Sequence, residues 1–124
     1  MFKRQLTTLI YVGYIYGAYL IWQLTGIETC GWTLIGALSS ENETARTVAG
    51  ILLVRAPDKA RPLIREAIAE KKGLRYILPI AAEVADEALE IEVRSFISDS
   101  DLEVRIATER AIRIIVARRS GRPL

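Results

Sequence analysis

The sequence contains no histidine and only one cysteine, Cys30. The missing histidine removes the commonest acid–base residue of enzymes and the commonest ligand of transition metals. A single cysteine allows no disulfide within the chain, so cysteine usage does not reveal the redox compartment. The net charge is also small, because 17 basic residues are balanced by 15 acidic ones to give +2. This balance lacks the electrostatic footprint of a nucleic-acid-binding protein, and we expect no nucleic-acid partner.

Patterns that carry catalysis are missing as well. No glycine-rich phosphate loop occurs, and Ser39 and Ser40 have no histidine that could serve as their base. The acidic run Glu83–Glu92 contains several carboxylates, but nothing in the sequence sets the pKa of one against another, and we interpret it as a solvated helix face. We therefore expect no enzymatic activity and no cofactor.

One knot of carboxylates resembles half of a metal site. Asp99, Asp101 and Glu103 alternate as in the first half of a calcium loop. No glycine follows at the sixth place, and the twelfth place holds Arg110 instead of a bidentate glutamate. Ser100 followed by Glu103 fits a capping box, and alternatively Asp101 caps the helix. The knot predicts the start of a helix and no metal.

A long stretch without charge opens the chain, from residue 5 to residue 27. A helix over Leu6–Leu24 would be roughly 29 Å long, close to the thickness of the hydrocarbon layer of a bilayer. Lys3 and Arg4 precede this stretch and the next basic residue is Arg46, which predicts a cytoplasmic N-terminus and a helical domain outside. We expect a single membrane-spanning anchor over residues 1–27. A cleaved signal peptide, a buried first helix and an interfacial helix remain alternatives.

Two kinds of residue in this stretch indicate a partner for it. Gly13 and Gly17 form a G-x-x-x-G pair, which would allow another backbone to approach closely. Tyr14 and Tyr16 would lie deep in the bilayer, where their hydroxyls need hydrogen-bond acceptors on a neighbouring helix. Trp22 would be an anchor at the membrane interface. We expect these glycines and tyrosines to contact other membrane proteins or a second copy.

The rest of the chain is predicted to be helical. Apolar residues recur at helical spacing and no long stretch alternates with period two, so we expect no sheet. Pro62 is expected in the first turn of its helix, Pro79 is expected to kink another, and Asp86 is expected to cap the next. The predicted helical segments are residues 31–40, 41–56, 59–72, 74–85 and 86–98, followed by one long final helix.

A register is visible in alternate helices. Each begins with an apolar residue followed by an arginine, and Arg46, Arg75 and Arg105 are spaced by 29 and 30 residues. A period near thirty, with two short helices in each unit, is typical of a helical solenoid. Each hairpin then exposes an apolar face that the next hairpin must cover.

The last of these units resembles a HEAT repeat, in the short form found in phycobilisome-lyase-like proteins. The matching residues are Asp101, Val104, Arg105, Ala107, Ala111 and Ile112. The first unit is similar at Asn42, Ala45, Arg46, Ala49 and Leu53, whereas the middle unit departs at Lys71 and Pro79. The resemblance implies that the turn aspartate and the repeat arginines brace neighbouring units. Such bracing would be carried by Asp101 and by Arg46, Arg75 and Arg105.

The predicted protein is all-α, with a transmembrane helix followed by a short α-solenoid of about three HEAT-like hairpins. We expect an anchor at residues 1–27, a repeat domain at 28–117 and a basic tail at 118–124. We expect a non-catalytic scaffold or accessory subunit, whose helical surface binds a client protein. One alternative is a lyase-like assembly factor that holds a tetrapyrrole or a client chain. The other is a soluble subunit whose apolar N-terminal helix is an oligomer interface.

Overall fold

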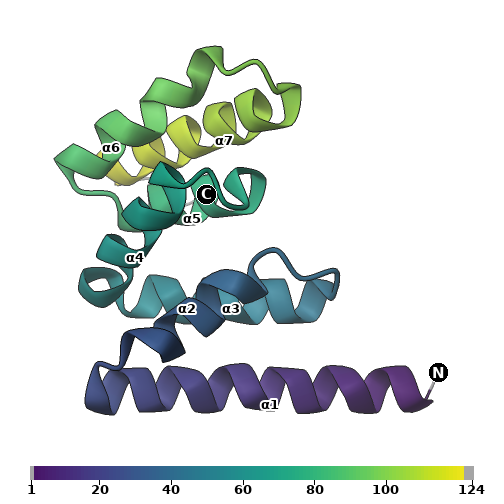
Figure 1. The fold of residues 1–124 in the computed structure, drawn as a ribbon. Coiled ribbons are helices and arrows are strands. Elements are labelled where there is room, and N and C mark those ends of the chain that lie inside the picture. The colour runs from purple at the N-terminus through teal and green to yellow at the C-terminus, as the bar shows by residue number, and fades with distance from the viewer. Residues whose placement is uncertain (1, 122–124) are drawn as a thin grey trace. The chain divides into compact units, whose positions relative to one another are not determined.

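The chain folds entirely into helices over the part that the computed structural model describes, residues 2–121. These residues form seven α-helices and one 3₁₀ segment, with no strand among them (Figure 1). The all-α prediction is therefore confirmed. The chain divides into two compact units, Met1–Leu63 and Ile64–Leu124.

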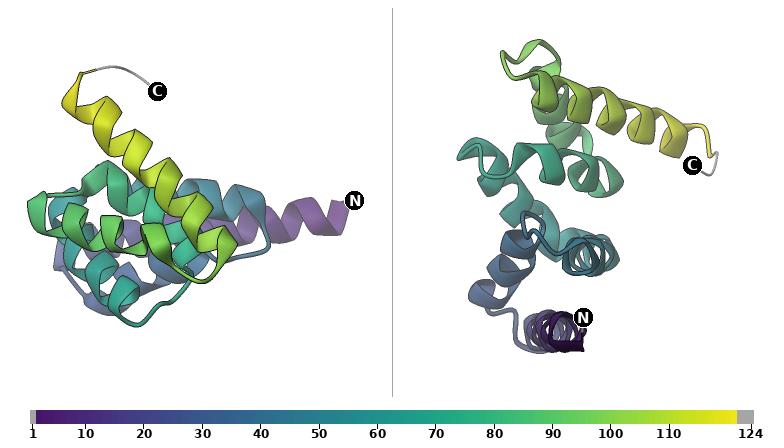
Figure 2. Two further views of the ribbon diagram at one scale, coloured as in Figure 1. Left: turned by 90° about the horizontal axis from the view of Figure 1, so that it is seen from above. Right: turned by 90° about the vertical axis from the view of Figure 1, so that its right-hand side faces the viewer.

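The first unit is built around one long helix. Helix α1 (Phe2–Thr25) packs against both α2 (Glu28–Ala37) and α3 (Glu43–Arg55), and α4 (Pro57–Ala69) begins in this unit. The right-hand view of Figure 2, which looks along α1, shows α2 and α3 on the same side of it. On that side Ile15, Ala18 and Trp22 of α1 are buried. The three residues are spaced by three and four positions, so they share one face of the helix.

Local residues set the ends of these helices. Gly26 ends α1 in the left-handed conformation, with φ of 73°, and its N–H donates to the Trp22 carbonyl at 2.8 Å. This conformation strains residues that carry a Cβ, so glycine is favoured here. Asn42 caps α3, because its side-chain oxygen accepts from the Ala45 N–H at 3.1 Å. Pro57 occupies the first position of α4, where a missing N–H does no harm.

The second unit continues α4 and adds α5 (Leu74–Val84), α6 (Glu87–Arg94), the 3₁₀ segment η1 (Ser95–Ser98) and α7 (Leu102–Arg119). Helix α7 packs on α5 and α6, and α5 packs on α6. The fully buried residues of these helices are mostly aliphatic: Leu78, Ala81, Ala82, Leu89, Val93 and Ala111. Arg65 of α4 bonds to Glu92 of α6 at 2.7 Å, and that hydrogen bond together with the carboxylate charge raises the pKa of Arg65.

The end of α4 shows the role of Lys71, the residue that departs from the predicted repeat pattern. The Lys72 N–H donates to the Ala67 carbonyl and the Lys71 N–H to the Ile68 carbonyl, each at 3.0 Å. These two bonds form a Schellman motif, which places Lys71 in the left-handed conformation with φ of 56°. Lys71 thus ends one helix, whereas the corresponding Asn42 and Asp101 each cap the start of one.

Pro62 lies further inside its helix than the sequence predicts, whereas Pro79 lies inside its helix as predicted. Because Pro57 starts α4 two residues early, Pro62 is the sixth residue of that helix and not part of its first turn. Pro79 is also a sixth residue, and α5 continues past it to Val84. Each proline lacks the N–H that the carbonyl four residues earlier would otherwise accept.

The spanning helix predicted at Leu6–Leu24 is not found, because none of the helices over residues 2–121 is both long and apolar enough to cross a membrane. Four tyrosines between residues 11 and 19 lower the hydropathy of α1. The predicted boundary at residue 27 lies inside the first unit, since α1 packs on α2 and α3. Of the predicted basic tail, Arg118 and Arg119 belong to α7, and Arg122 lies outside the described residues.

Candidate functional site

The most prominent surface feature of the chain is the side of α1 that faces away from α2 and α3. At 100° per residue, Leu6 and Leu24 lie directly opposite the buried Ile15. Exposure on this side ranges from 46% for Leu20 to 85% for Leu24. We call this surface the apolar arc, and it consists of Leu6, Leu9, Ile10, Tyr14, Tyr16, Leu20, Ile21 and Leu24.

The apolar arc is larger than a monomeric protein ordinarily exposes. If each side chain has about 200 Å² to expose, the arc presents on the order of 1,000 Å² of apolar surface. The largest apolar patch of a typical monomer is about 300–600 Å², and one side of a standard protein interface is about 800 Å². A surface of this size is typical of a binding site.

The four residues predicted to bind a partner all lie on this side of α1. A Cβ added to Gly13 or to Gly17 would have no atom within 4 Å, so the backbone is open there. Tyr14 is 65% exposed and Tyr16 is 47% exposed. The structure thus brings the G-x-x-x-G pair and the two tyrosines together on the apolar arc.

The opposite side of α1 is fixed to its own unit by polar contacts near both ends. The Asn42 side-chain nitrogen donates to the Thr8 hydroxyl at 2.8 Å. The Lys59 ammonium donates to the Gln23 carbonyl at 2.7 Å and to the Trp22 carbonyl at 3.3 Å. Because Lys59 meets the last carbonyls of α1, its charge also complements the helix dipole.

Sequence reasoning missed these contacts and misplaced Trp22. Lys59 follows Trp22 by 37 residues, and no local signal pairs them. Trp22 was predicted to be a membrane-interface anchor, but it is 2% exposed and packs beside Gly31. Its spacing of seven from Ile15 was the available signal, since residues seven apart share a helix face.

Two of the predicted bracing arginines make the same contact. The Arg46 guanidinium donates to the Ser40 carbonyl at 2.7 Å, and the Arg105 guanidinium donates to the Asp99 carbonyl at 2.8 Å. In each case the acceptor lies six residues upstream, across the turn that precedes the helix. Each arginine also follows a helix cap by four residues, Asn42 in one helix and Asp101 in the other.

Arg75 behaves differently from these two arginines. Its guanidinium pairs with Glu103 of α7 at 3.4 Å and lies 5.2 Å from the centre of the Tyr76 ring. The contact joins α5 to α7 within the second unit. Arg75 therefore links two helices, whereas Arg46 and Arg105 each fasten the turn before their own helix.

The carboxylates of the knot before α7 act on the backbone and on Arg75. The Asp101 side chain accepts from the Glu103 N–H at 2.9 Å and caps α7, and Asp99 accepts from the Asp101 N–H at 2.9 Å. Of the two alternatives left open by the sequence, the cap at Asp101 is the one observed. The cap predicted at Asp86 is also confirmed, since Asp86 accepts from the Leu89 N–H at 2.9 Å.

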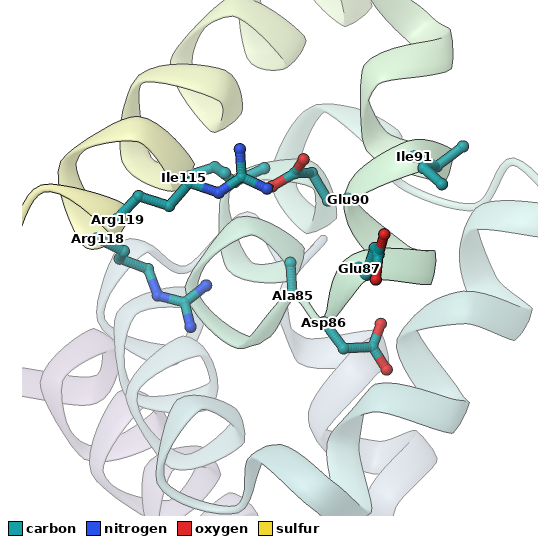
Figure 3. Close-up of a pocket in the computed structure, with 8 residues that line it drawn as sticks. All are labelled: Ala85, Asp86, Glu87, Glu90, Ile91, Ile115, Arg118 and Arg119. Carbon is teal, nitrogen blue, oxygen red and sulfur yellow. The ribbon is translucent and has the colours of Figure 1, made fainter.

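A pocket of about 430 Å³ lies between the start of α6 and the end of α7 (Figure 3). Figure 3 shows Arg118 and Arg119 on the α7 side and Asp86, Glu87 and Glu90 on the α6 side. Arg119 pairs with Glu90 at 2.5 Å, and Arg118 donates to the Ala82 carbonyl at 2.6 Å. These contacts fasten the end of α7 to α5 and α6, which accounts for both arginines.

No protein-family model, curated protein or solved structure matches the chain. Among the described residues, the apolar arc is the strongest candidate site.

Proposed function

We propose that this protein is a non-catalytic accessory protein that binds a membrane through α1 and presents HEAT-like helical hairpins to a partner protein. The observation that carries the proposal is the apolar arc, which covers on the order of 1,000 Å² and is not covered by any of the residues that the structure describes. In water such a surface favours aggregation or association, so α1 is suited to an apolar environment.

The repeat part of the proposal is supported by the two equivalent arginines. Arg46 and Arg105 stand four residues after a helix cap and donate to a carbonyl six residues upstream. The shared contact supports the proposal that α3 and α7 are equivalent helices of a repeat. HEAT-like hairpins serve mainly as binding surfaces, so a protein partner is consistent with the proposed repeat.

The proposal is tested in cells with a photoreactive amino acid placed at one exposed position at a time. Ile106 and Arg110 on α7 and Ile51 on α3 are exposed sites on the two equivalent helices. We expect the chain to sediment with membranes and to give one discrete cross-linked protein from at least one of these positions. A chain that stays in the supernatant and gives no product from any position contradicts the proposal.

One observation favours a second candidate, a subunit whose α1 is an interface between copies. Gly13 and Gly17 are open on the apolar arc, which permits close approach of another helix. This candidate predicts a stable dimer of 27.8 kDa, twice the 13.9 kDa chain, in buffer without lipid. Light scattering of the purified chain distinguishes it from the first candidate, which predicts association with membranes.

A further inference from the structure

We propose that the apolar arc binds the surface of a lipid bilayer, with α1 lying parallel to the membrane and its arc buried just below the headgroups. This inference rests on the proposed membrane function and specifies its geometry. It places α2 and α3 on the water side of α1, because both pack on the face opposite the arc (Figure 1). Helices that bind in this way typically bury an apolar face about 5–10 Å deep.

The width of the arc favours a lipid surface over a single helix as its occupant. At 100° per residue, the arc extends from Tyr16 through Leu6 to Tyr14 and covers roughly 160° of the helix surface. A face that packs on one neighbouring helix is narrower, with a stripe of about 100° or less. One partner helix would leave part of the arc in water, whereas a bilayer covers all of it.

The polar contacts of α1 favour a helix that lies parallel to the membrane over one that crosses it. The contacts at Thr8 and Trp22 lie 14 residues apart, or roughly 21 Å along the helix, which is less than the roughly 30 Å of a hydrocarbon layer. If α1 crossed the bilayer, either Asn42 with its acidic neighbours or the Lys59 ammonium would be inside the hydrocarbon. Burying charge there is expensive. A parallel α1 keeps both groups in water.

One charge at the end of the arc fits lipid phosphates. At 100° per residue, the exposed Lys3 lies on the same side of α1 as the arc, and α1 contains no acidic residue. Cations near a membrane surface are attracted to anionic headgroups, and the attraction weakens as salt is added. We therefore expect tighter binding to anionic vesicles than to neutral ones, with the apolar arc supplying most of the affinity.

The depth of individual arc residues tests the proposal. Cys30 is replaced by serine, and one cysteine at a time is introduced at Leu6, Ile10, Leu20 or Leu24 and labelled with a fluorescent probe. The full-length chain is mixed with protein-free vesicles of phosphatidylcholine and phosphatidylglycerol whose acyl chains carry bromine at known depths. We expect all four probes to be quenched at one shallow depth. A probe at Ile51, exposed on α3 of the same unit, should remain unquenched.

Each other outcome overturns the proposal in a recognisable way. If the probes at Leu6 and Leu24 lie at a shallow depth in the bilayer and those at Ile10 and Leu20 lie deeper, α1 spans the bilayer. If no probe is quenched and the labelled chain is a dimer, a second copy of the chain covers the arc. A chain that sediments with native membranes but ignores protein-free vesicles would retain the proposed function, with a membrane protein as the occupant. A chain that binds neither would overturn both.

A matched pair of variants gives a second test. Ile10→Asp combined with Leu24→Asp places two charges on the arc, both at exposed positions, so the fold should tolerate them. Each variant is checked by circular dichroism. We expect vesicle binding to weaken at least a hundredfold, because two side chains lose their burial in lipid. Ile51→Asp, at an exposed site on α3 of the same unit, should bind like the unmodified chain. Equal binding by all three proteins would overturn the proposal.

Discussion

Gly31→Ala tests whether α1 is packed on its own unit. A Cβ at Gly31 would lie 2.5 Å from the Leu63 Cδ1 and 2.9 Å from two ring atoms of Trp22. Both neighbours are at least 96% buried, so neither can swing freely into water. Such overpacking destabilises a protein by about 1–3 kcal/mol, whereas alanine in place of glycine within a helix stabilises it by about 1 kcal/mol.

Gly36→Ala is the matched control, because Gly36 lies in the same helix and an added Cβ there meets no atom within 4 Å. We expect Gly31→Ala to be less stable than Gly36→Ala by about 1–3 kcal/mol, since the gain in helix propensity largely cancels between them. Urea unfolding followed by tryptophan fluorescence measures the difference within the first unit, where both tryptophans, Trp22 and Trp32, lie. If Gly31→Ala is as stable as Gly36→Ala, the packing of Trp22 against α2 is wrong.

Three further predictions concern the second unit, and urea unfolding followed by circular dichroism measures all of them. Arg105→Ala loses the hydrogen bond to the turn before α7 and should destabilise the protein by about 1–2 kcal/mol. Arg113→Ala, at an exposed site, should change the stability little. Equal effects of the two substitutions would show that the Arg105 hydrogen bond does not stabilise the protein. Lys71→Gly removes the backbone strain of a residue that carries a Cβ in the left-handed conformation, and it should stabilise the protein by about 1 kcal/mol. An equal gain from Lys72→Gly would show that the gain has another cause. Glu90→Gln removes the carboxylate that Arg94 and Arg119 share and should destabilise the protein by about 1–3 kcal/mol. An unchanged midpoint of urea unfolding would show that these ion pairs do not contribute to stability.

Local signals in the sequence were enough to predict most of the helices. Proline, glycine and aspartate mark the breaks, and the caps at Asp86 and Asp101 lie where side-chain chemistry places them. The equivalence of Arg46 and Arg105 was also visible, because a repeated contact needs only a repeated local sequence. Arg75 broke this pattern because α4 ends with a left-handed Lys71, a feature set by the geometry of the helix end.

The placement of α1 could not be predicted from composition. The charge-free stretch is long enough to span a membrane. Its length does not reveal which side of the helix packs against other helices of the same chain. The occupied side is defined by contacts with Asn42 and Lys59, 34 and 37 residues away from their partners on α1. The solenoid, the cytoplasmic N-terminus and the partner protein stay predictions.

Hydrogen exchange of the full-length chain, measured with and without anionic vesicles, tests most directly whether α1 is a packed helix with one face left for lipid. We predict that amides between residues 12 and 22 are protected in buffer to the same degree as those of α3, because α1 packs on α2 and α3. Vesicles should leave this protection in place and add to it on α1 alone. If α1 exchanges freely in buffer and becomes protected only with vesicles, it is an independent anchor and not part of the first unit.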